Sequence, residues 1–335
     1  MNQFLRVLWL LLGLAAVGWL CRRFGLSDLG AAFERFNVGD LFVYACAAVA
    51  VLLGYSLRWR LVMQTTATPP PLRRLVAARL AGDAVGALLP GGKLGGDPVR
   101  IALTADAGRG GVRASAAVAI DRVMELISNS LCAIVYVSIF SWTRVETRAG
   151  APLLLLATLL VPLLALFTLV GVLRAARRPF TPLLLRAVQT VPRLRSAADA
   201  VRRTEDQLIG FFRDYPFRFV LGLLGSLVVE LGIIGEYHFL LKAFGIALNL
   251  PTLMMVVVAS GLTRAVPTPG GVGALEAGEV TVLGLASGQP EVGFIVGMVL
   301  RLHETLWTLV GLLLLLTQGM SFARLRVLAA GKAVA

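Results

Sequence analysis

The sequence has few residues of the kinds that bind metals or form disulfides. Its 335 residues include two histidines and three cysteines. The cysteines, Cys21, Cys46 and Cys132, lie in or beside apolar runs without paired spacing, which indicates neither a disulfide framework nor a C-x-x-C metal site. The two histidines, His238 and His303, are too few for a histidine-based metal centre. We therefore expect no metal and no other cofactor.

Charged residues are also scarce, at 15% of the chain, whereas hydrophobic residues make up 57%. The mean hydropathy of +0.81 and repeated apolar runs long enough to cross a bilayer exclude an ordinary soluble domain. The composition predicts an all-α polytopic membrane protein. The formal net charge of +13 supports an anionic partner only weakly, because many basic residues lie in loops where membrane topology explains them. We expect no nucleic-acid partner.

Apolar runs predict about six transmembrane helices. The first is residues 7–20, which we interpret as a membrane anchor because no small-x-small cleavage site follows it. The other runs are residues 41–57, 114–142, 152–173, 217–241 and 291–317. Two further stretches, 72–104 and 251–287, are moderately apolar and are broken at their centres by Pro-Gly-Gly. Each half of such a stretch is too short to cross a hydrocarbon core of about 30 Å.

The distribution of basic residues predicts how these segments are oriented. The loop 174–216, the C-terminal tail and the arginines after the second span, Arg58 and Arg60 among them, should be cytoplasmic. With both termini cytoplasmic, the stretch 72–104 begins and ends inside and the stretch 251–287 begins and ends outside. The two stretches would then be oppositely oriented re-entrant helical hairpins, as in inverted-repeat transporters. A kinked pair of full spans at each place fits the charges equally well.

Two copies of Pro-Gly-Gly, at residues 90–92 and 269–271, are followed by charged residues at equal distances. Seven residues after each proline stands an acid, and 32 and 35 residues after it stand an arginine and a glutamate: Asp97, Arg122 and Glu125 in the first half, Glu276, Arg301 and Glu304 in the second. The chain is therefore interpreted as a single membrane domain, residues 1–335, with a first repeat half at 1–142 and a second at 217–318. The basic, amphipathic loop 174–216 joins them.

The residues around the glycines predict helix starts. Asp97 is a suitable N-cap and Pro98 suits the first helical position, while Glu276 should enter the helix that follows the second copy. The glycines allow close backbone approach, and unpaired amides at helix starts bind anions. The alternative is that glycine and proline only form tight turns.

The arginines and glutamates of the spans lie on shared helical faces. Arg122 and Glu125 are three residues apart, as are Arg301 and Glu304, and Asp121 extends the first polar stripe. Because charges in hydrocarbon are costly, such groups either pair with one another or mark an ion or substrate path. Both interpretations remain open here. Secondary candidates for proton coupling are Glu230 and Glu236, with His238 nearby.

These motifs resemble those of the lysylphosphatidylglycerol synthase transmembrane-region family, also called flippase-like. The resemblance is carried by Leu89-Pro90, Gly95-Gly96-Asp97, Arg100, Asp121-Arg122, Pro267-x-Pro269-Gly270-Gly271-x-Gly273-x-x-Glu276 and Arg301. It implies an integral inner-membrane protein that moves a lipid between leaflets. In the two-domain synthases of this family a soluble aminoacyl-transferase domain follows the membrane part. Because the sequence ends at Ala335, shortly after the last span, we expect that this chain alone is not an enzyme.

The resulting hypothesis is alternating access at a cavity between the two hairpins. An anionic phospholipid, or a polyprenyl- or hopanoid-type lipid, would be bound by Lys93, Arg100, Arg122, Arg301, Gly91, Gly92, Gly270 and Gly271. Proton coupling or ion pairs would involve Asp97, Asp121, Glu125, Glu276 and Glu304. The alternatives are a membrane-embedded enzyme that modifies lipid head groups and a scaffold for lipid-biosynthetic enzymes. Gly293 and Gly297 could pack helices within one chain or in a homo-oligomer.

Overall fold

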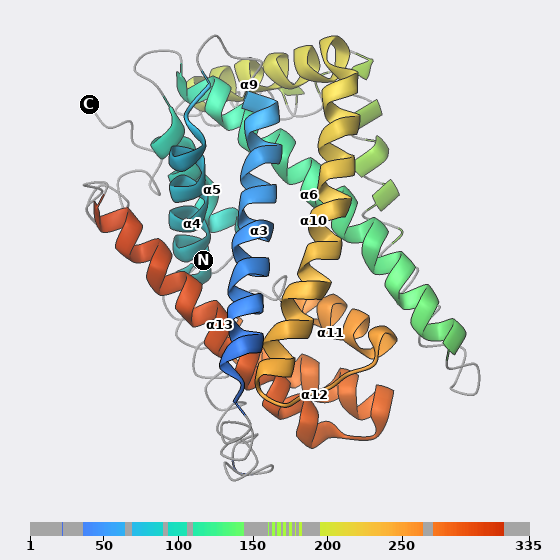
Figure 1. Ribbon diagram of the computed structural model, residues 1–335. Coiled ribbons are helices and arrows are strands. Elements are labelled where there is room, and N and C mark those ends of the chain that lie inside the picture. The colour runs from blue at the N-terminus through green and yellow to red at the C-terminus, as the bar shows by residue number, and fades with distance from the viewer. Residues whose placement is uncertain are drawn as a thin grey trace.

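The computed structural model describes residues 36–63, 69–89, 93–105, 110–143, 195–263 and 271–317, together with residue 22 and scattered positions between 160 and 182. The described elements are helices. Four of them are long and apolar enough to cross a membrane: α3 (Val38–Met63), α6 (Gly110–Thr143), α10 (Pro216–Ala243) and α13 (Pro290–Thr317) (Figure 1). The all-α membrane class predicted from composition is confirmed.

These four helices correspond to four of the six predicted spans. The predicted span 7–20 lies outside the described residues, as does most of 152–173. The helix α3 continues to Met63, beyond the predicted end of its apolar run, because Trp59, Val62 and Met63 continue its buried face. Arg58 therefore lies inside the helix and is 4% exposed, rather than after the end of the span.

Four shorter helices form two pairs where the sequence predicted hairpins. The helices α4 (Leu72–Leu88) and α5 (Lys93–Thr104) pack against each other, as do α11 (Leu250–Thr263) and α12 (Ala274–Ser287). The first pair lies in the upper half of the bundle and the second pair in the lower half (Figure 1). The connections at 90–92 and 264–270 lie outside the described residues.

The start of α5 differs from the prediction. The helix begins at Lys93, so Pro98 lies within it and Asp97 is not its N-cap. The prediction was wrong because the local cap signal competes with a tertiary contact: a Cβ on Gly96 would overlap the carbonyl oxygen of Gly82 in α4. The glycines at 95 and 96 therefore belong to a helix that packs backbone against backbone. By contrast, Glu276 lies in the first turn of α12, as predicted.

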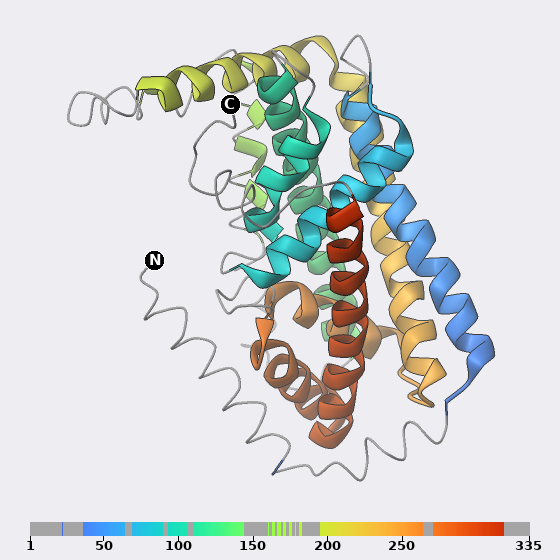
Figure 2. The same cartoon turned by 90° about the vertical axis from the view of Figure 1, so that its left-hand side faces the viewer.

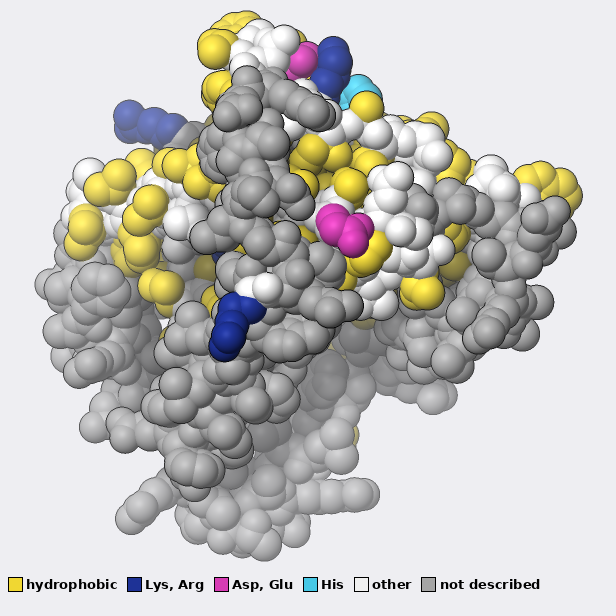
Figure 3. Space-filling view, turned by 90° about the horizontal axis from the view of Figure 1, so that it is seen from below, with side chains coloured by type: hydrophobic (Ala, Val, Ile, Leu, Met, Phe, Trp, Pro, Cys, Tyr) yellow, Lys and Arg dark blue, Asp and Glu magenta, His cyan; other side chains and the backbone are white. Residues whose placement is uncertain are grey.

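The helix α9 (Arg195–Asp214) runs across the ends of the long helices (Figure 2). Its apolar residues Ile209, Phe211 and Phe212 are buried in a cluster shared with α6, while Arg202 and Arg203 are exposed. The apolar side of the C-terminal half of α9 is thus covered by protein. Seen from the opposite end of the bundle, the described side chains are mostly hydrophobic, and few are charged (Figure 3).

The long helices pack unevenly. The helix α10 lies along α3, whereas α13 lies along α12 and α4 and touches α10 at only a few positions. Gly293 and Gly297 face the backbone of α12, so this small-residue pair packs helices within the chain. The close approach also brings the first turn of α12 next to Arg301 on α13.

Candidate functional site

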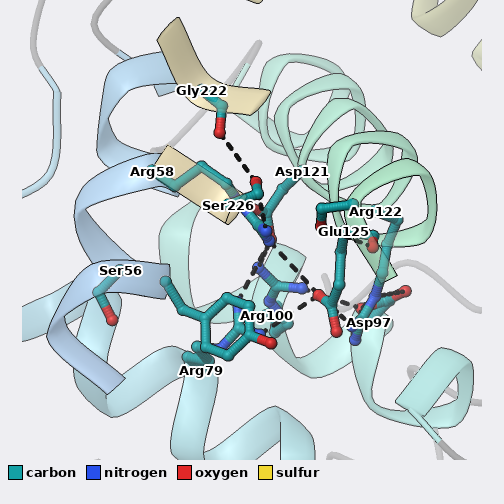
Figure 4. Close-up of polar contacts among 12 residues, drawn as sticks. Ser56, Arg58, Arg79, Asp97, Arg100, Asp121, Arg122, Glu125, Gly222 and Ser226 are labelled. Atoms are coloured by element: carbon teal, nitrogen blue, oxygen red, sulfur yellow. Dashed lines mark hydrogen bonds and ion pairs between the residues drawn. The ribbon is translucent and has the colours of Figure 1, made fainter. Parts of the chain in front are cut away.

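Eight charged side chains meet where α3, α4, α5 and α6 pack together, and we call them the first cluster; Figure 4 labels all of them except Asp83. They are Arg58, Arg79, Asp83, Asp97, Arg100, Asp121, Arg122 and Glu125. The formal charges of these four arginines and four acids cancel. The low exposure of the arginines makes this balance necessary, because an unpaired buried charge costs several kcal/mol.

Asp121 lies at the centre of the first cluster. Its carboxylate accepts hydrogen bonds from Arg58 Nε at 2.8 Å, from Arg100 Nη2 at 2.7 Å and from Arg79 Nη1 at 3.4 Å. Asp121 and Arg100 are fully buried. The guanidinium of Arg100 also stacks on the ring of Trp59, 4.2 Å from its centroid. One carboxylate therefore joins three helices through their arginines.

Arg122 links the α4–α5 pair to α6. Its Nη2 donates to Asp97 Oδ1 at 2.8 Å, and its Nη1 donates to Glu125 Oε2 at 3.0 Å. Asp83 Oδ1 lies 4.0 Å from Arg122 Nη2. The predicted pairing of Arg122 with Glu125 on one helical face is present, and Asp97 is its partner from the neighbouring helix.

Arg301 forms the centre of a second cluster, with Gly271, Glu276 and Glu304. Its Nε donates to Glu276 Oε1 at 2.8 Å, its Nη1 to Glu304 Oε2 at 3.2 Å and its Nη2 to the carbonyl oxygen of Gly271 at 2.9 Å. The other oxygen of Glu276 accepts the backbone N–H of Gly273 at 3.0 Å. Arg301 therefore fastens the start of α12 to α13.

The two clusters share one contact pattern. Arg122 and Asp97 are 25 residues apart, as are Arg301 and Glu276, and each arginine also bonds a glutamate three residues further along its own helix. In each case a span holds the second helix of the preceding short pair. The matched spacings in the sequence thus correspond to matched ion pairs.

A cavity of about 260 Å³ lies between the clusters. Arg79 and Asp83 line it from the first cluster, and Gly271 and Glu304 line it from the second. Its wall also contains Tyr55, Glu236, Tyr237, His303 and Trp307. The volume approaches the lower end of ordinary ligand sites, at about 300 Å³. It therefore suits a small ligand or one part of a larger one.

The predicted site residues fall into three groups. Asp97, Arg100, Asp121, Arg122, Glu125, Glu276, Arg301 and Glu304 lie in the two clusters, and of these only Glu304 is among the described residues that line the cavity. Gly271 lines the cavity and has a φ of 62°, which favours glycine. Gly91, Gly92 and Gly270 lie outside the described residues, as does the side chain of Lys93.

Sequence reasoning missed Arg58, Arg79 and Asp83. Arg58 follows the predicted apolar run 41–57, although the apolar residues that continue to Met63 indicate a longer helix. Arg79 and Asp83 are an i,i+4 pair on α4, with Arg79 Nε 3.7 Å from Asp83 Oδ2. Opposite charges four residues apart, in the middle of this helix and among apolar residues, indicate an ion pair that the sequence could have revealed.

A double-mutant cycle on Arg301→Met and Glu276→Gln tests whether the second cluster holds α12 to α13. We expect a coupling free energy of about 1–2 kcal/mol from thermal unfolding in detergent, because Glu276 is only 1% exposed. The matched control is the Arg213–Asp214 pair, whose side chains are 66% and 49% exposed and which should show little coupling. Equal coupling in the two cycles would contradict the assignment.

Comparison with protein families gives one match. The family model described as the lysylphosphatidylglycerol synthase TM region matches residues 6–321. Comparisons with curated proteins and with solved structures found no match. The matched range includes both clusters and the cavity.

Proposed function

Because the chain belongs to the lysylphosphatidylglycerol synthase transmembrane-region family, we propose that it moves a membrane lipid between the two leaflets. The observation that carries the proposal is the position of the cavity. Its wall includes residues of both ion-pair clusters, Arg79 and Asp83 from one and Gly271 and Glu304 from the other. A head group in this cavity would contact both halves of the protein, as alternating access requires.

We further propose that α4–α5 and α11–α12 are re-entrant hairpins of an inverted repeat. The shared contact pattern around Arg122 and Arg301 supports the repeat. The positions of the pairs in opposite halves of the bundle support their opposite orientation (Figure 1). The end that carries α9 would face the cytoplasm, because Arg202 and Arg203 are exposed there and few charges are seen at the other end (Figure 3). The membrane would be the bacterial inner membrane.

The cavity lining also bears on the predicted head-group contacts. Arg122 and Arg301 bond carboxylates and are not among the described lining residues. Three acids, Asp83, Glu236 and Glu304, face the cavity together with Arg79. This set favours a head group that carries an amine beside its phosphate. A purely anionic lipid, as predicted from the sequence, would require its phosphate to displace carboxylates from the arginines.

The paired acids have a structural role in this proposal. Asp97, Asp121 and Glu276 each accept hydrogen bonds from arginines and hold the short helix pairs in place. Glu304 differs, because it both bonds Arg301 and faces the cavity. The clusters would thus form the rigid frame, and the carboxylates facing the cavity would meet the lipid.

Lipid translocation in proteoliposomes tests the proposal. The variants Asp83→Asn and Glu304→Gln should slow the movement of a fluorescent aminophospholipid by about tenfold or more, the cost of one interaction of about 1.4 kcal/mol. Glu291→Gln, an exposed substitution of the same kind on α13, is the control and should leave the rate unchanged.

The same assay separates the alternatives. Translocation of only anionic lipids would favour the head-group prediction made from the sequence. Chemical change of the lipid, followed by mass spectrometry, would indicate an enzyme. If the wild-type protein changes neither the leaflet nor the chemistry of any lipid in a panel of anionic, zwitterionic and cationic head groups, the transport proposal is wrong and a scaffold is favoured.

A further inference from the structure

The cavity wall contains a histidine held between a tyrosine and a glutamate. Nδ1 of His303 on α13 lies 2.6 Å from the hydroxyl of Tyr44 on α3. Its Nε2 lies 3.7 Å from Oε1 of Glu236 on α10. The side chains of His303 and Glu236 are only 11% and 7% exposed, yet both residues line the cavity. Three helices thus meet at one imidazole.

His303 was not the histidine that the sequence placed with Glu236. His238 is two residues from Glu236 on α10, but residues two apart on a helix do not share a face. Accordingly, His238 is exposed, and Glu236 points to His303 instead. Since the chain has two histidines, His238 provides a natural internal control for any measurement on His303.

The contact joins α13 to α3 and α10, two helices that α13 otherwise touches at few positions. The helices α3 and α10 pack along each other, while α13 packs along α12 and α4. Between α10 and α13 there are few contacts. A change in charge at His303 therefore acts on one of the few direct links between α10 and α13.

The charged and titratable groups around His303 come from each neighbouring helix. Tyr44 and Tyr55 belong to α3, Arg79 and Asp83 to α4, Glu236 and Tyr237 to α10, and Glu304 to α13; each of them contacts His303 or lines the same cavity. On α12, Glu276 accepts a hydrogen bond from Arg301 of α13, and Glu279 accepts one from Ser260. Arg79 and Arg301 both have carboxylate partners in the clusters. At 3.7 Å, the contact between Oε1 of Glu236 and Nε2 of His303 is an ion pair when the imidazole is protonated.

We infer that His303 and Glu236, supported by Tyr44, form a proton-binding latch that couples the cavity to pH. This inference rests on the proposed transport function. With the proton bound, the imidazolium faces the Glu236 carboxylate through Nε2, and this attraction holds α13 to α10. Its Nδ1–H donates to the Tyr44 oxygen on α3. When the proton leaves Nδ1 through the cavity, Tyr44 turns to donate to Nδ1. Nε2–H still faces Glu236, but the imidazole is now neutral, so the attraction that holds α13 to α10 weakens.

The charge of His303 sets the direction of the pH effect. The latch is closed at low pH, where histidine is charged, and opens as pH rises through the range of about 5 to 8 in which histidine titrates. Opening allows α13 to move relative to α10, while Tyr44 of α3 stays bonded to His303. Translocation should therefore quicken as pH rises through this range, by up to about tenfold per pH unit where one proton controls the step.

Histidine NMR tests the latch without depending on transport. The full-length protein with labelled histidines in nanodiscs should show two titrating signals, of which His238→Gln removes one. The remaining His303 signal should shift its midpoint in Glu236→Gln and in Tyr44→Phe, because both variants remove a partner of the imidazole. The inference would be overturned by a His303 signal that keeps one charge state from pH 5 to 8. A midpoint that stays at the wild-type value in both variants would overturn it as well.

Lipid translocation is the second measurement that tests the latch. In proteoliposomes, His303→Gln and Glu236→Gln should lose the pH dependence of translocation, while His238→Gln should keep the wild-type profile. An unchanged pH profile in both latch variants overturns the latch even if transport occurs. A wild-type protein that moves no lipid overturns the proposed function instead, and the NMR arm then still decides whether His303 and Glu236 share a proton.

Discussion

Replacing Asp121 with alanine is expected to destabilise the protein by about 3–5 kcal/mol, the usual cost of removing one partner from a buried ion pair. Asp121 is fully buried and accepts hydrogen bonds from Arg58, Arg79 and Arg100. Without its carboxylate, three buried arginines would compete for Asp97 and Glu125. The loss should appear as a large drop in the midpoint of thermal unfolding in detergent.

Asp206→Ala is the matched control, because Asp206 pairs with Arg178 at 2.7 Å but both side chains are more than two-fifths exposed, at 42% and 43%. An exposed pair contributes about 0–1 kcal/mol. Asp121→Asn should fall between the two, since the amide keeps the shape and one acceptor but not the charge. Comparable midpoints for Asp121→Ala and Asp206→Ala would show that the first cluster does not stabilise the fold.

Replacing Gly96 with alanine is expected to have the second large effect. A Cβ at this position would overlap the carbonyl oxygen of Gly82, so α4 and α5 would have to move apart. Overpacking in a close contact costs about 1–3 kcal/mol and sometimes more. Because α5 carries Asp97 and Arg100, the same movement would pull two members out of the first cluster. We expect both lower thermal stability and loss of lipid translocation.

Gly225→Ala on α10 is the control for this substitution. An added Cβ at Gly225 would meet nothing within 4 Å, and alanine is preferred over glycine inside a helix by up to about 1 kcal/mol. This variant should be as stable as the wild type or slightly more so. If Gly96→Ala behaves in the same way, the backbone contact between α4 and α5 is not formed in the membrane.

The matched spacing of the two clusters could be recognised in the sequence. The offsets that join Asp97 to Arg122 and Glu276 to Arg301 are properties of the chain, and the structure brings both pairs within hydrogen-bond distance. The long apolar helices were predictable for a similar reason, since bilayer thickness sets their length. Patterns of this kind can be recognised in the sequence because they join helices that follow one another along the chain.

The composition of the first cluster could not be predicted in the same way. Arg58 and Asp121 are 63 residues apart, and their contact depends on how α3 packs against α6. The position of Pro98 inside α5 likewise depends on the contact between Gly82 and Gly96 in a neighbouring helix. In both cases tertiary packing overrides the local signal, a flanking arginine in one and a cap motif in the other.

The contact between His303 and Glu236 could not be predicted from the sequence either. Nearness in sequence associated Glu236 with His238, whereas helix geometry turns these two side chains apart and packing brings His303 to Glu236 from another helix. The acidic character of the cavity was missed for a related reason. Arg100, Arg122 and Arg301, which the sequence predicted to bind an anionic lipid, lie in the clusters. Instead, Asp83 and Glu236 face the cavity.

The most direct test of the central claim is an electron cryo-microscopy structure of the protein in nanodiscs made from lipids of its own membrane. The account predicts head-group density in the cavity between the two clusters, within hydrogen-bond distance of Asp83 or Glu304, with the acyl chains leading out to the bilayer. An empty cavity, with lipid head groups only at the ends of the bundle, would contradict it.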